Sequence, residues 1–334
     1  KVQSGEDEEV MVSITDNQLD IYKESVNYLT GYKYLCNEQL ASKLIGLLAY
    51  QQYMQSKGEK VKVDKAIRPI IHRLTNHQNK HQLWSWWGNS ENTSFWMSAH
   101  ILRALKMAQD AGYPVELNLN GLKVEYAHTR PYRGMKLEDI EILHALHEWK
   151  VEADYSSAVR LLEPFVRQLE QKEDSLANRN KYYRPLSYLK EKLLLWEIKQ
   201  QVDSVNVGDS VRPYLKKDML EGVYCDDGRR TYYWEGNQMI NTLIAYRIIK
   251  NDPSLCKLKE NMQLYILRTK ERGWNTYQAS SAVATVLTDL LAGSGGMSGT
   301  SVSVSGKDHQ RITEFPYHAP VSYTHLTLPT NSLV

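Results

Sequence analysis

Three stretches of this sequence repeat one plan, in which tryptophan is followed by small or polar residues and then by an amphipathic helix. They lie at 86–105, 232–249 and 272–291. A helix pair of this kind leaves an apolar face that a neighbouring pair must cover. Stacked pairs form either an open solenoid or a closed ring, and the unequal lengths of the repeats favour the ring. We therefore predict a mainly α fold, an α/α toroid of helical hairpins, with a cavity where the inner helices begin.

Helical periodicity extends from about residue 17 to 292, and polar or Gly/Pro breaks such as "SKGEK" and "AGYP" separate the helices. Before it, the alternating "VMVSIT" predicts a strand, and after it "VSVSGKDHQRITEFPYHAPV" predicts a β-hairpin that turns at Ser-Gly. The predicted organisation is a strand and linker from a neighbouring β domain at 1–16, the toroid at 17–293, the start of the following β domain at 294–320, and a non-native tail at 321–334.

Composition excludes several functional classes. The net charge is +2, from 41 basic and 39 acidic residues, which does not suggest a nucleic acid or an anionic membrane as partner. No apolar run approaches the ~20 residues of a transmembrane helix. The chain begins at Lys1 rather than Met, which indicates a fragment. Three cysteines are too few for a disulfide scaffold, and their spacing matches no zinc motif, so no metal or other cofactor is expected.

The aromatic residues are mostly amphipathic, with 22 Tyr and 8 Trp against 3 Phe. Tyr and Trp pack like apolar residues but keep a hydrogen-bonding end. They suit the wall of a polar-rimmed cavity, although half-buried positions in an ordinary helical protein explain them equally well.

One cysteine and one glutamine are spaced for a reaction. If a helix begins near Cys36, Gln39 lies one turn further on the same face. Partial positive charge at the helix start is expected to lower the pKa of the thiol. A thiolate beside an amide carbonyl can displace ammonia and leave an internal thioester, which needs an aromatic cover against water. By itself, a Cys-x-x-Gln at a helix start is also common by chance.

The surrounding sequence is informative. "GYKYLCNEQLASKL" (31–44) resembles the thioester segment of the alpha-2-macroglobulin and complement family, whose bacterial members typically carry Tyr-Pro-Tyr-Gly-Cys-x-Glu-Gln before an apolar helix. "LWSWWGNSENTSFWMSAHILRALKMAQDAGYPV" is similar to the Trp-rich loop and helix of that family, and "RGWNTYQASSAVATVLTDLL" to the last inner helix of its thioester domain. The resemblance covers about residues 18–293 and implies an α/α toroid.

This sequence departs from the family pattern at three places. Lys33 replaces the usual Pro and Leu35 the usual Gly, and Leu35 would be strained if its backbone needs a positive φ. Asn37 stands where animal members have Gly, a milder change because Asn tolerates that region. Both thioester partners are present.

The resemblance implies a bacterial-type, broad-spectrum protease inhibitor rather than an enzyme. A protease cuts a bait region elsewhere in the whole protein, the thioester is uncovered, and it acylates a lysine of the protease. The thiol leaving group would be Cys36 and the acyl carbon that of Gln39, with Glu38 and Asn37 in support. The implied setting is the periplasm, the cell envelope or the extracellular space, with neighbouring domains of the same protein as further partners. Candidates for the dry wall, from motif position, are Tyr32, Tyr34, Trp87, Trp96, Tyr233, Trp234, Trp274 and Tyr277.

Histidines suggest two further functions. His144 and His147 lie in the region where animal members that transfer to hydroxyls carry a transacylation histidine, but neither has a matching local motif. An ordinary helix with two histidines one turn apart explains them as well. His72, His77 and His81 lack a carboxylate or cysteine at metal-ligand spacing and are expected on a solvated surface.

Two other functions are compatible with a toroid. A carbohydrate-active enzyme would use a pair of carboxylates in the cavity, and Asp226, Asp227 and Glu235 lie near aromatic residues. An acidic loop is the simpler explanation of that cluster. The other alternative is a toroid without a thioester that serves only as a structural or interaction module.

Overall fold

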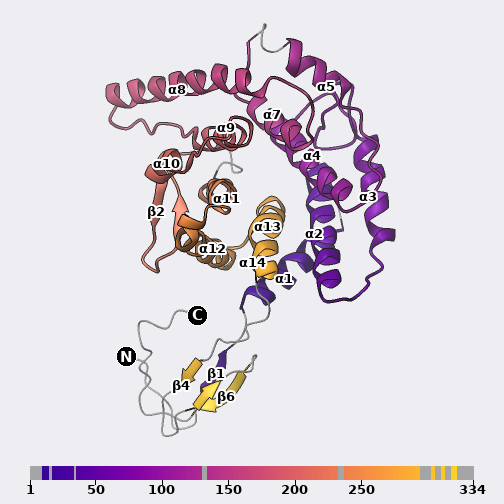
Figure 1. Ribbon diagram of the computed structural model, residues 1–334, viewed down its shortest axis with the longest axis vertical. Helices are drawn as coiled ribbons and strands as arrows, with labels where there is room; N and C mark the ends of the chain where they lie inside the picture. The colour runs from indigo at the N-terminus through magenta and orange to yellow at the C-terminus, as the bar shows by residue number, and fades with distance from the viewer. Residues whose placement is uncertain are drawn as a thin grey trace.

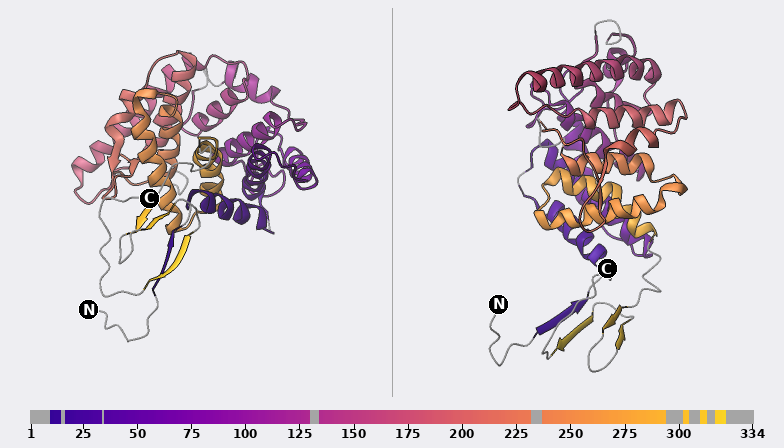
Figure 2. Two further views of the ribbon diagram at one scale, coloured as in Figure 1. Left: turned by 60° about the horizontal axis from the view of Figure 1, so that its bottom comes forward. Right: turned by 90° about the vertical axis from the view of Figure 1, so that its left-hand side faces the viewer.

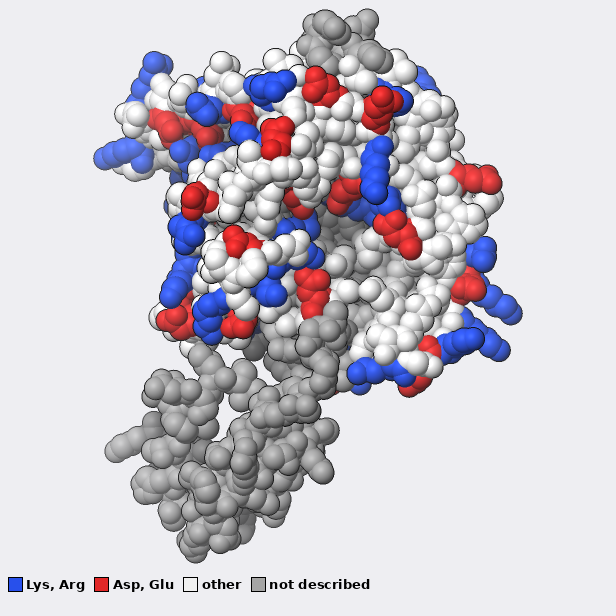
Figure 3. All heavy atoms as spheres, viewed as in Figure 1, with Lys and Arg blue, Asp and Glu red and all other residues white. Residues whose placement is uncertain are grey.

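The computed structural model describes residues 10–14, 17–33, 35–129, 134–231, 237–293, 302–304, 310–312 and 317–321. Within these ranges the protein is mainly α, and its helices form two concentric layers (Figure 1). Seen in that direction, the surface is hollowed at the centre of the ring, and acidic and basic side chains both border the hollow (Figure 3).

The inner layer is a closed ring of helices. Its members are α2 (Asn37–Ser56), α4 (Phe95–Asp110), α7 (Asp139–Glu148), α9 (Leu189–Val202), α11 (Gln238–Ile249) and α13 (Thr276–Ala282). Each packs against the next in this order, and α13 packs against α2, which closes the ring. The predicted α/α toroid is therefore confirmed.

The outer layer supplies the second helix of each hairpin. It comprises α1 (Asn17–Gly31), α3 (Asp64–Asn76), α5 (Asn120–Val124), α8 (Tyr155–Arg179), α10 (Gly208–Val211) and α12 (Cys256–Thr269). In Figure 1 these helices surround the ring, and α8 packs on α9 just as α12 packs on α11. After α13 the chain passes through a π-helical turn, Val283–Leu287, into α14 (Thr288–Gly293).

Short antiparallel strand pairs complete the described part. Inside the helical region β2 (Leu215–Lys217) pairs with β3 (Val223–Cys225). Outside it β1 (Val10–Ile14) pairs with β6 (Tyr317–Val321), and β4 (Val302–Val304) with β5 (Gln310–Ile312). The strand expected at "VMVSIT" and the hairpin expected after the helices are both present. In the views of Figure 2 the strands outside the helical region, β1, β4, β5 and β6, lie beyond one edge of the ring.

Burial explains the two layers. The inner helix α11 is buried on almost every side, from Met239 to Tyr246 and again at Ile248 and Ile249. The outer helix α8 buries a single stripe that follows the 3.6-residue period, formed by Tyr155, Ala158, Val159, Leu162 and Val166. A helix that is apolar all round must be enclosed by others, whereas a striped helix covers a surface. The core accordingly follows the inner ring.

All inner helices begin at the same end of the ring. A cavity there is lined by residues from the starts of α4, α7 and α9, and a second by residues from the starts of α9, α11 and α13. A hydrogen bond between Thr276 and Glu38 joins the starts of α13 and α2. Because each inner helix returns through an outer one, the inner helices run parallel and their N-terminal ends are brought together.

Candidate functional site

Cys36 and Gln39 lie together at the start of α2. Cys36 is the residue that precedes the first helical turn, and its backbone N–H donates a 3.1 Å hydrogen bond to Oε1 of Gln39. The side-chain amide of Gln39 is thus folded back over the cysteine, while the backbone N–H of Gln39 points at the sulfur. The two side chains that the sequence paired as a thioester are neighbours on one helical turn.

The same geometry occurs elsewhere in the ring with an ordinary capping residue. At the start of α13, Asn275 accepts from the backbone N–H of Gln278, and its own N–H donates 3.1 Å to Oε1 of Gln278. This reciprocal pattern is a capping box. A thiol is a weak acceptor, and preferred capping residues are Asn, Asp, Ser and Thr. Helix capping therefore explains Gln39 but gives no reason for a cysteine at position 36.

The environment of the cysteine differs from the sequence-based expectation. Cys36 is only 5% exposed. Burial raises the pKa of its thiol; the N–H of Gln39 opposes this, and the nearby carboxylate of Glu38 adds to it. The predicted lowering of the pKa by the helix start is therefore wrong, because desolvation of a charged sulfur outweighs the partial charge of the backbone. The free cysteine is a protonated thiol at neutral pH.

Asn37 connects the cysteine turn to the Trp-rich loop before α4. Its backbone N–H donates a 3.0 Å hydrogen bond to the carbonyl of Trp86. Its Nδ2 donates hydrogen bonds of 2.8 Å and 3.0 Å to the carbonyls of Ser85 and Gly88. Its Oδ1 lies 2.6 Å from Nδ1 of His77, which donates to it. Asn37 is 1% exposed, so these partners replace the water that its polar groups lose on burial.

Glu38 ties the same turn to α13 and α4. Its Oε2 accepts from Thr276 at 2.8 Å, and its Oε1 accepts from Ser42 at 2.7 Å. The oxygen of Ser42 lies 3.0 Å from Nε2 of His100. Since Ser42 gives its only proton to Glu38, His100 donates to Ser42 and is neutral, and burial lowers the pKa of His100 to about 3.

Aromatic rings continue from this turn across the helix starts. The rings of Trp86 and Trp96 meet edge to face at 5.8 Å, and those of Trp96 and Tyr277 at 5.2 Å. Trp274 is buried and donates to Thr269. Trp87, predicted in the wall, is 64% exposed and does not contribute to a dry wall; the ring of Trp86, itself 44% exposed, contacts Trp96 instead.

The remaining wall candidates are peripheral or outside the description. Tyr32 is at the surface, where its carbonyl accepts from Lys43 at 3.2 Å. Tyr34, Tyr233 and Trp234 lie outside the described residues.

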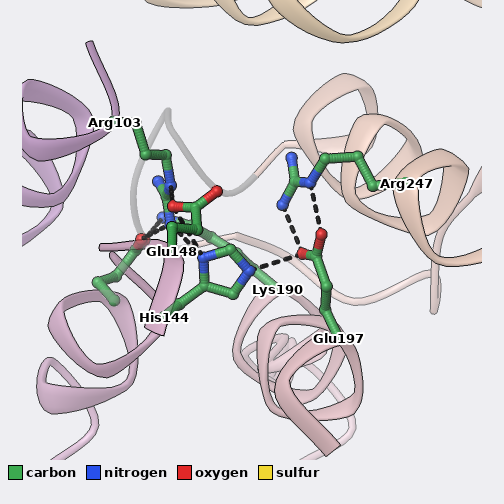
Figure 4. A network of polar contacts seen from close by, with 7 residues as sticks. Arg103, His144, Glu148, Lys190, Glu197 and Arg247 are labelled. Carbon is green, nitrogen blue, oxygen red and sulfur yellow. Dashed lines mark hydrogen bonds and ion pairs between the residues drawn. The ribbon is translucent and has the colours of Figure 1, made fainter. Parts of the chain in front are cut away.

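His144 belongs to a buried charge network, not to the cysteine turn (Figure 4). Its Nε2 lies 2.7 Å from Glu197, and its Nδ1 lies 3.4 Å from Glu148. Arg247 binds both oxygens of Glu197 at 2.8 Å and 2.7 Å. The network joins α7, α9 and α11, and it reaches α4 through Arg103, which contacts Glu148 at 3.0 Å.

Among the other histidines, His147 is half-buried against the ring of Tyr155. His72 and His81 are exposed, as expected. The prediction that His77 also lies on a solvated surface is wrong, since it is half-buried against Asn37. In the described part of the chain, no group of three or more His, Cys, Asp or Glu side chains is placed to hold a metal ion.

The carboxylates considered for a sugar site bind neighbouring side chains of the same protein. Asp226 pairs with Lys216 at 3.0 Å, and Asp227 accepts from Ser187 at 2.7 Å. Glu235 lies outside the described residues.

Sequence reasoning missed the buried or half-buried residues that hold the turn in place. These are Ser42 of α2 itself and, from other elements, His77, His100 and Thr276. Ser42 alone carried a signal, because it stands one helical turn after Glu38 and within reach of it. The others are brought to the turn by ring closure, which no local pattern encodes.

Comparison with known proteins places the fold. No protein-family model matches the chain, and no curated protein matches it in sequence. Among solved structures it is similar to a Y1175G mutant of Salmonella alpha-2-macroglobulin (TM-score 0.59, 14% identity, 94% of this chain and 22% of that one). It is also similar to Salmonella alpha-2-macroglobulin reacted with methylamine (0.58, 15%, 90% and 19%) and to Escherichia coli alpha-2-macroglobulin activated by porcine elastase (0.52, 13%, 89% and 26%).

The chain therefore has the fold of one region of bacterial alpha-2-macroglobulins, and it spans about a fifth to a quarter of their length. Within the described residues, no helix is both long enough and apolar enough to span a bilayer.

Proposed function

We propose that this chain is the thioester domain of an alpha-2-macroglobulin-type protease inhibitor, in which Cys36 and Gln39 form an internal thioester. The observation that carries the proposal is a cysteine in the capping position, with the N–H of Gln39 directed at its sulfur and its own N–H donating a 3.1 Å hydrogen bond to Oε1 of Gln39. A donor on that oxygen polarises the amide carbonyl and stabilises the negative charge that develops when sulfur attacks its carbon. The proton of the thiol passes to the amide nitrogen, the bond from carbon to nitrogen breaks, ammonia leaves, and the acyl group remains on sulfur.

The acylation step follows from the same geometry. An amine nitrogen of a protease lysine attacks the acyl carbon, the bond to sulfur breaks, and Cys36 leaves as a thiol. Its raised pKa means that the departing sulfur readily takes a proton. The acyl group is consumed once, so the domain acts as a trap and not as a catalyst. Bacterial alpha-2-macroglobulins of this fold include one reacted with methylamine and one activated by elastase, which supports amine and protease partners for this chain.

The whole protein would work in the periplasm or at the cell envelope, with further domains that contain the bait. A toroid without a thioester is the alternative that the experiment must exclude. The carbohydrate alternative is weakened, because Asp226 and Asp227 are engaged by Lys216 and Ser187.

The test is intact mass with thiol titration on freshly prepared protein. Wild type is expected to be lighter than its sequence mass by one ammonia and to resist alkylation at Cys36. Methylamine should add one amine and release one thiol. The matched control is Gln39→Glu, whose carboxylate keeps the capping hydrogen bond but offers no amide to displace; it should have its full mass and a free thiol. A wild type of full mass, with Cys36 alkylated before any amine is added, contradicts the proposal.

A further inference from the structure

The cavity at the start of α11 is not accounted for by the proposed thioester chemistry. It has a volume of about 510 Å³. Its lining comes from α12, from the segments that lead into α9, α11 and α13, and from the first turns of α11 and α13. None of its described lining residues belongs to the turn of Cys36 and Gln39. A cavity of this size accommodates an organic ligand and not only a single ion.

Two side chains in the lining of this cavity have buried polar atoms without a hydrogen-bond partner. Asn241 is 2% exposed, and its Oδ1 has no partner within the described residues. Arg229 binds Asp174 through Nη2 at 2.8 Å, whereas its Nη1 is buried and has no partner there. Buried polar atoms are almost always bonded, because an unbonded one costs free energy. A ligand that bonds them would offset this cost.

The charge around the cavity favours an anion. The charged side chains among its described lining residues are Asp226, Arg229, Arg230 and Arg272. Asp226 is paired with Lys216, and Arg229 with Asp174. Arg230 donates to a backbone carbonyl at 2.9 Å, and neither it nor Arg272 forms an ion pair within the described residues. The start of α11, a helix of 12 residues, adds partial positive charge. Water in the cavity would bond a polar atom but leave this charge unbalanced.

The ligand that fits this lining has a carboxylate, an aliphatic stem and a peptide group. Guanidinium groups bind a carboxylate through paired hydrogen bonds. The rings of Tyr265 and Trp274 line the same cavity and would pack on methylene groups, which inorganic phosphate lacks. The amide of Asn241 can donate and accept, as a peptide group does. We infer that this cavity binds an acidic peptide segment, with a glutamate side chain at Arg230 and Arg272 and a neighbouring peptide group at Asn241.

The first test measures peptide binding to the 334-residue protein by calorimetry. The probe is acetyl-Gly-Glu-Gly-amide, whose blocked ends carry neither an amine nor a second carboxylate. Its dissociation constant should be about 0.1–1 mM, and acetyl-Gly-Gln-Gly-amide should bind at least about 10-fold more weakly. Salt at ~0.5 M should remove most of that difference. Absence of binding, equal affinities of the two peptides, or tighter binding of inorganic phosphate or glutarate overturns the inference.

The second test removes the guanidinium group of Arg272, which is exposed and forms no ion pair within the described residues. Arg272→Gln should therefore fold as wild type does. It should bind the glutamate peptide about 5- to 20-fold more weakly and leave the affinity for the glutamine peptide unchanged. Arg167→Gln, an exposed position on the outer helix α8, is the matched control and should equal wild type. Wild-type affinity for the glutamate peptide in Arg272→Gln overturns the inference.

The third test separates binding from stability at Asn241. Asn241→Leu keeps the branched shape and removes a buried oxygen that has no partner, so its thermal midpoint should be at least that of wild type. Its affinity for the glutamate peptide should fall at least about 5-fold, because the peptide group loses its partner. Wild-type affinity in this variant overturns the place of Asn241 in the site. If Asn241→Leu does not fold, the affinity of Arg272→Gln decides the inference.

Discussion

The backbone N–H of Cys36 donates to the side-chain oxygen of Gln39 across one turn of α2, at 3.1 Å. The contact serves two purposes. It satisfies an N–H group that has no partner within the helix, and it holds the amide of Gln39 against the cysteine. The arrangement of Cys36 and Gln39 is thus a capping box in which a cysteine holds the capping position.

This relationship predicts that Cys36 makes α2 less stable than a better capping residue at the same position would. In the Gln39→Glu background, where no thioester can form, Cys36→Ser should raise the free energy of unfolding by about 0.5–1 kcal/mol, because a hydroxyl accepts the N–H of residue 39 better than sulfur does. Urea denaturation measures the difference. Cys36→Ala in the same background is the control and should be less stable than the serine variant. A serine variant no more stable than the cysteine parent would show that the sulfur is not a weak cap.

The local part of this site was accessible from sequence, because one helical turn fixes the distance between Cys36 and Gln39. The sign of the thiol pKa was not accessible. It depends on how much water is excluded from the turn, and that is set by the Trp-rich loop and by α13, which are distant in sequence. Leu35, which replaces the usual glycine, is not among the residues with positive φ, so the backbone strain considered for it is absent.

A second prediction concerns the attachment of the Trp-rich loop. Asn37→Ala removes three side-chain hydrogen bonds, to Ser85, Gly88 and His77. Buried carbonyls left without a donor are costly, so the free energy of unfolding should fall by about 2–3 kcal/mol in urea denaturation. The exposed Asn76 of α3 offers a matched control, and Asn76→Ala should change stability by less than about 0.5 kcal/mol. An equal loss of stability in the two variants would show that the hydrogen bonds of Asn37 do not hold the Trp-rich loop in place.

A third prediction uses the buried carboxylate of the same turn. Burial raises the pKa of Glu38 above its ordinary value of 4.5, although Ser42 and Thr276 oppose the shift. For an acid whose pKa is higher in the folded state, the stabilising contribution is complete below the ordinary value and is lost as pH rises through the folded value. Stability of wild type relative to Glu38→Gln should therefore fall as the pH is raised from about 4.5. Urea denaturation across this range tests the sign, and a difference that rises with pH would refute it.

The fold was more predictable than the residues inside it. The apolar period identified the helices, and repeated helix pairs indicated a ring, because each pair must be covered by the next. Neither the apolar period nor the repeats indicates which charged side chains meet between the inner helices. In the sequence, Glu197 and Arg247 are indistinguishable from the exposed polar residues of any two helices. Only closure of the ring brings them into contact.

His144 in the buried charge network makes the stability of the ring depend on pH. Burial would lower the pKa of His144, but the carboxylates of Glu197 and Glu148 outweigh it and raise the pKa above its ordinary value of 6.5. Arg103, which can only donate, lies 3.1 Å from Nδ1 and opposes this shift. A histidine with a raised folded pKa contributes stability that is complete below 6.5 and is lost as pH rises through the folded value.

His144→Gln can still donate to Glu197 but cannot become charged. Its deficit in the free energy of unfolding should therefore be largest near pH 5.5 and should shrink toward pH 9, because wild type then also loses its charge. His147→Gln is the matched control one turn away; burial lowers the pKa of His147, so its pH dependence should have the opposite sign. A His144→Gln deficit that stays constant or grows with pH would show that His144 is neutral in the folded ring.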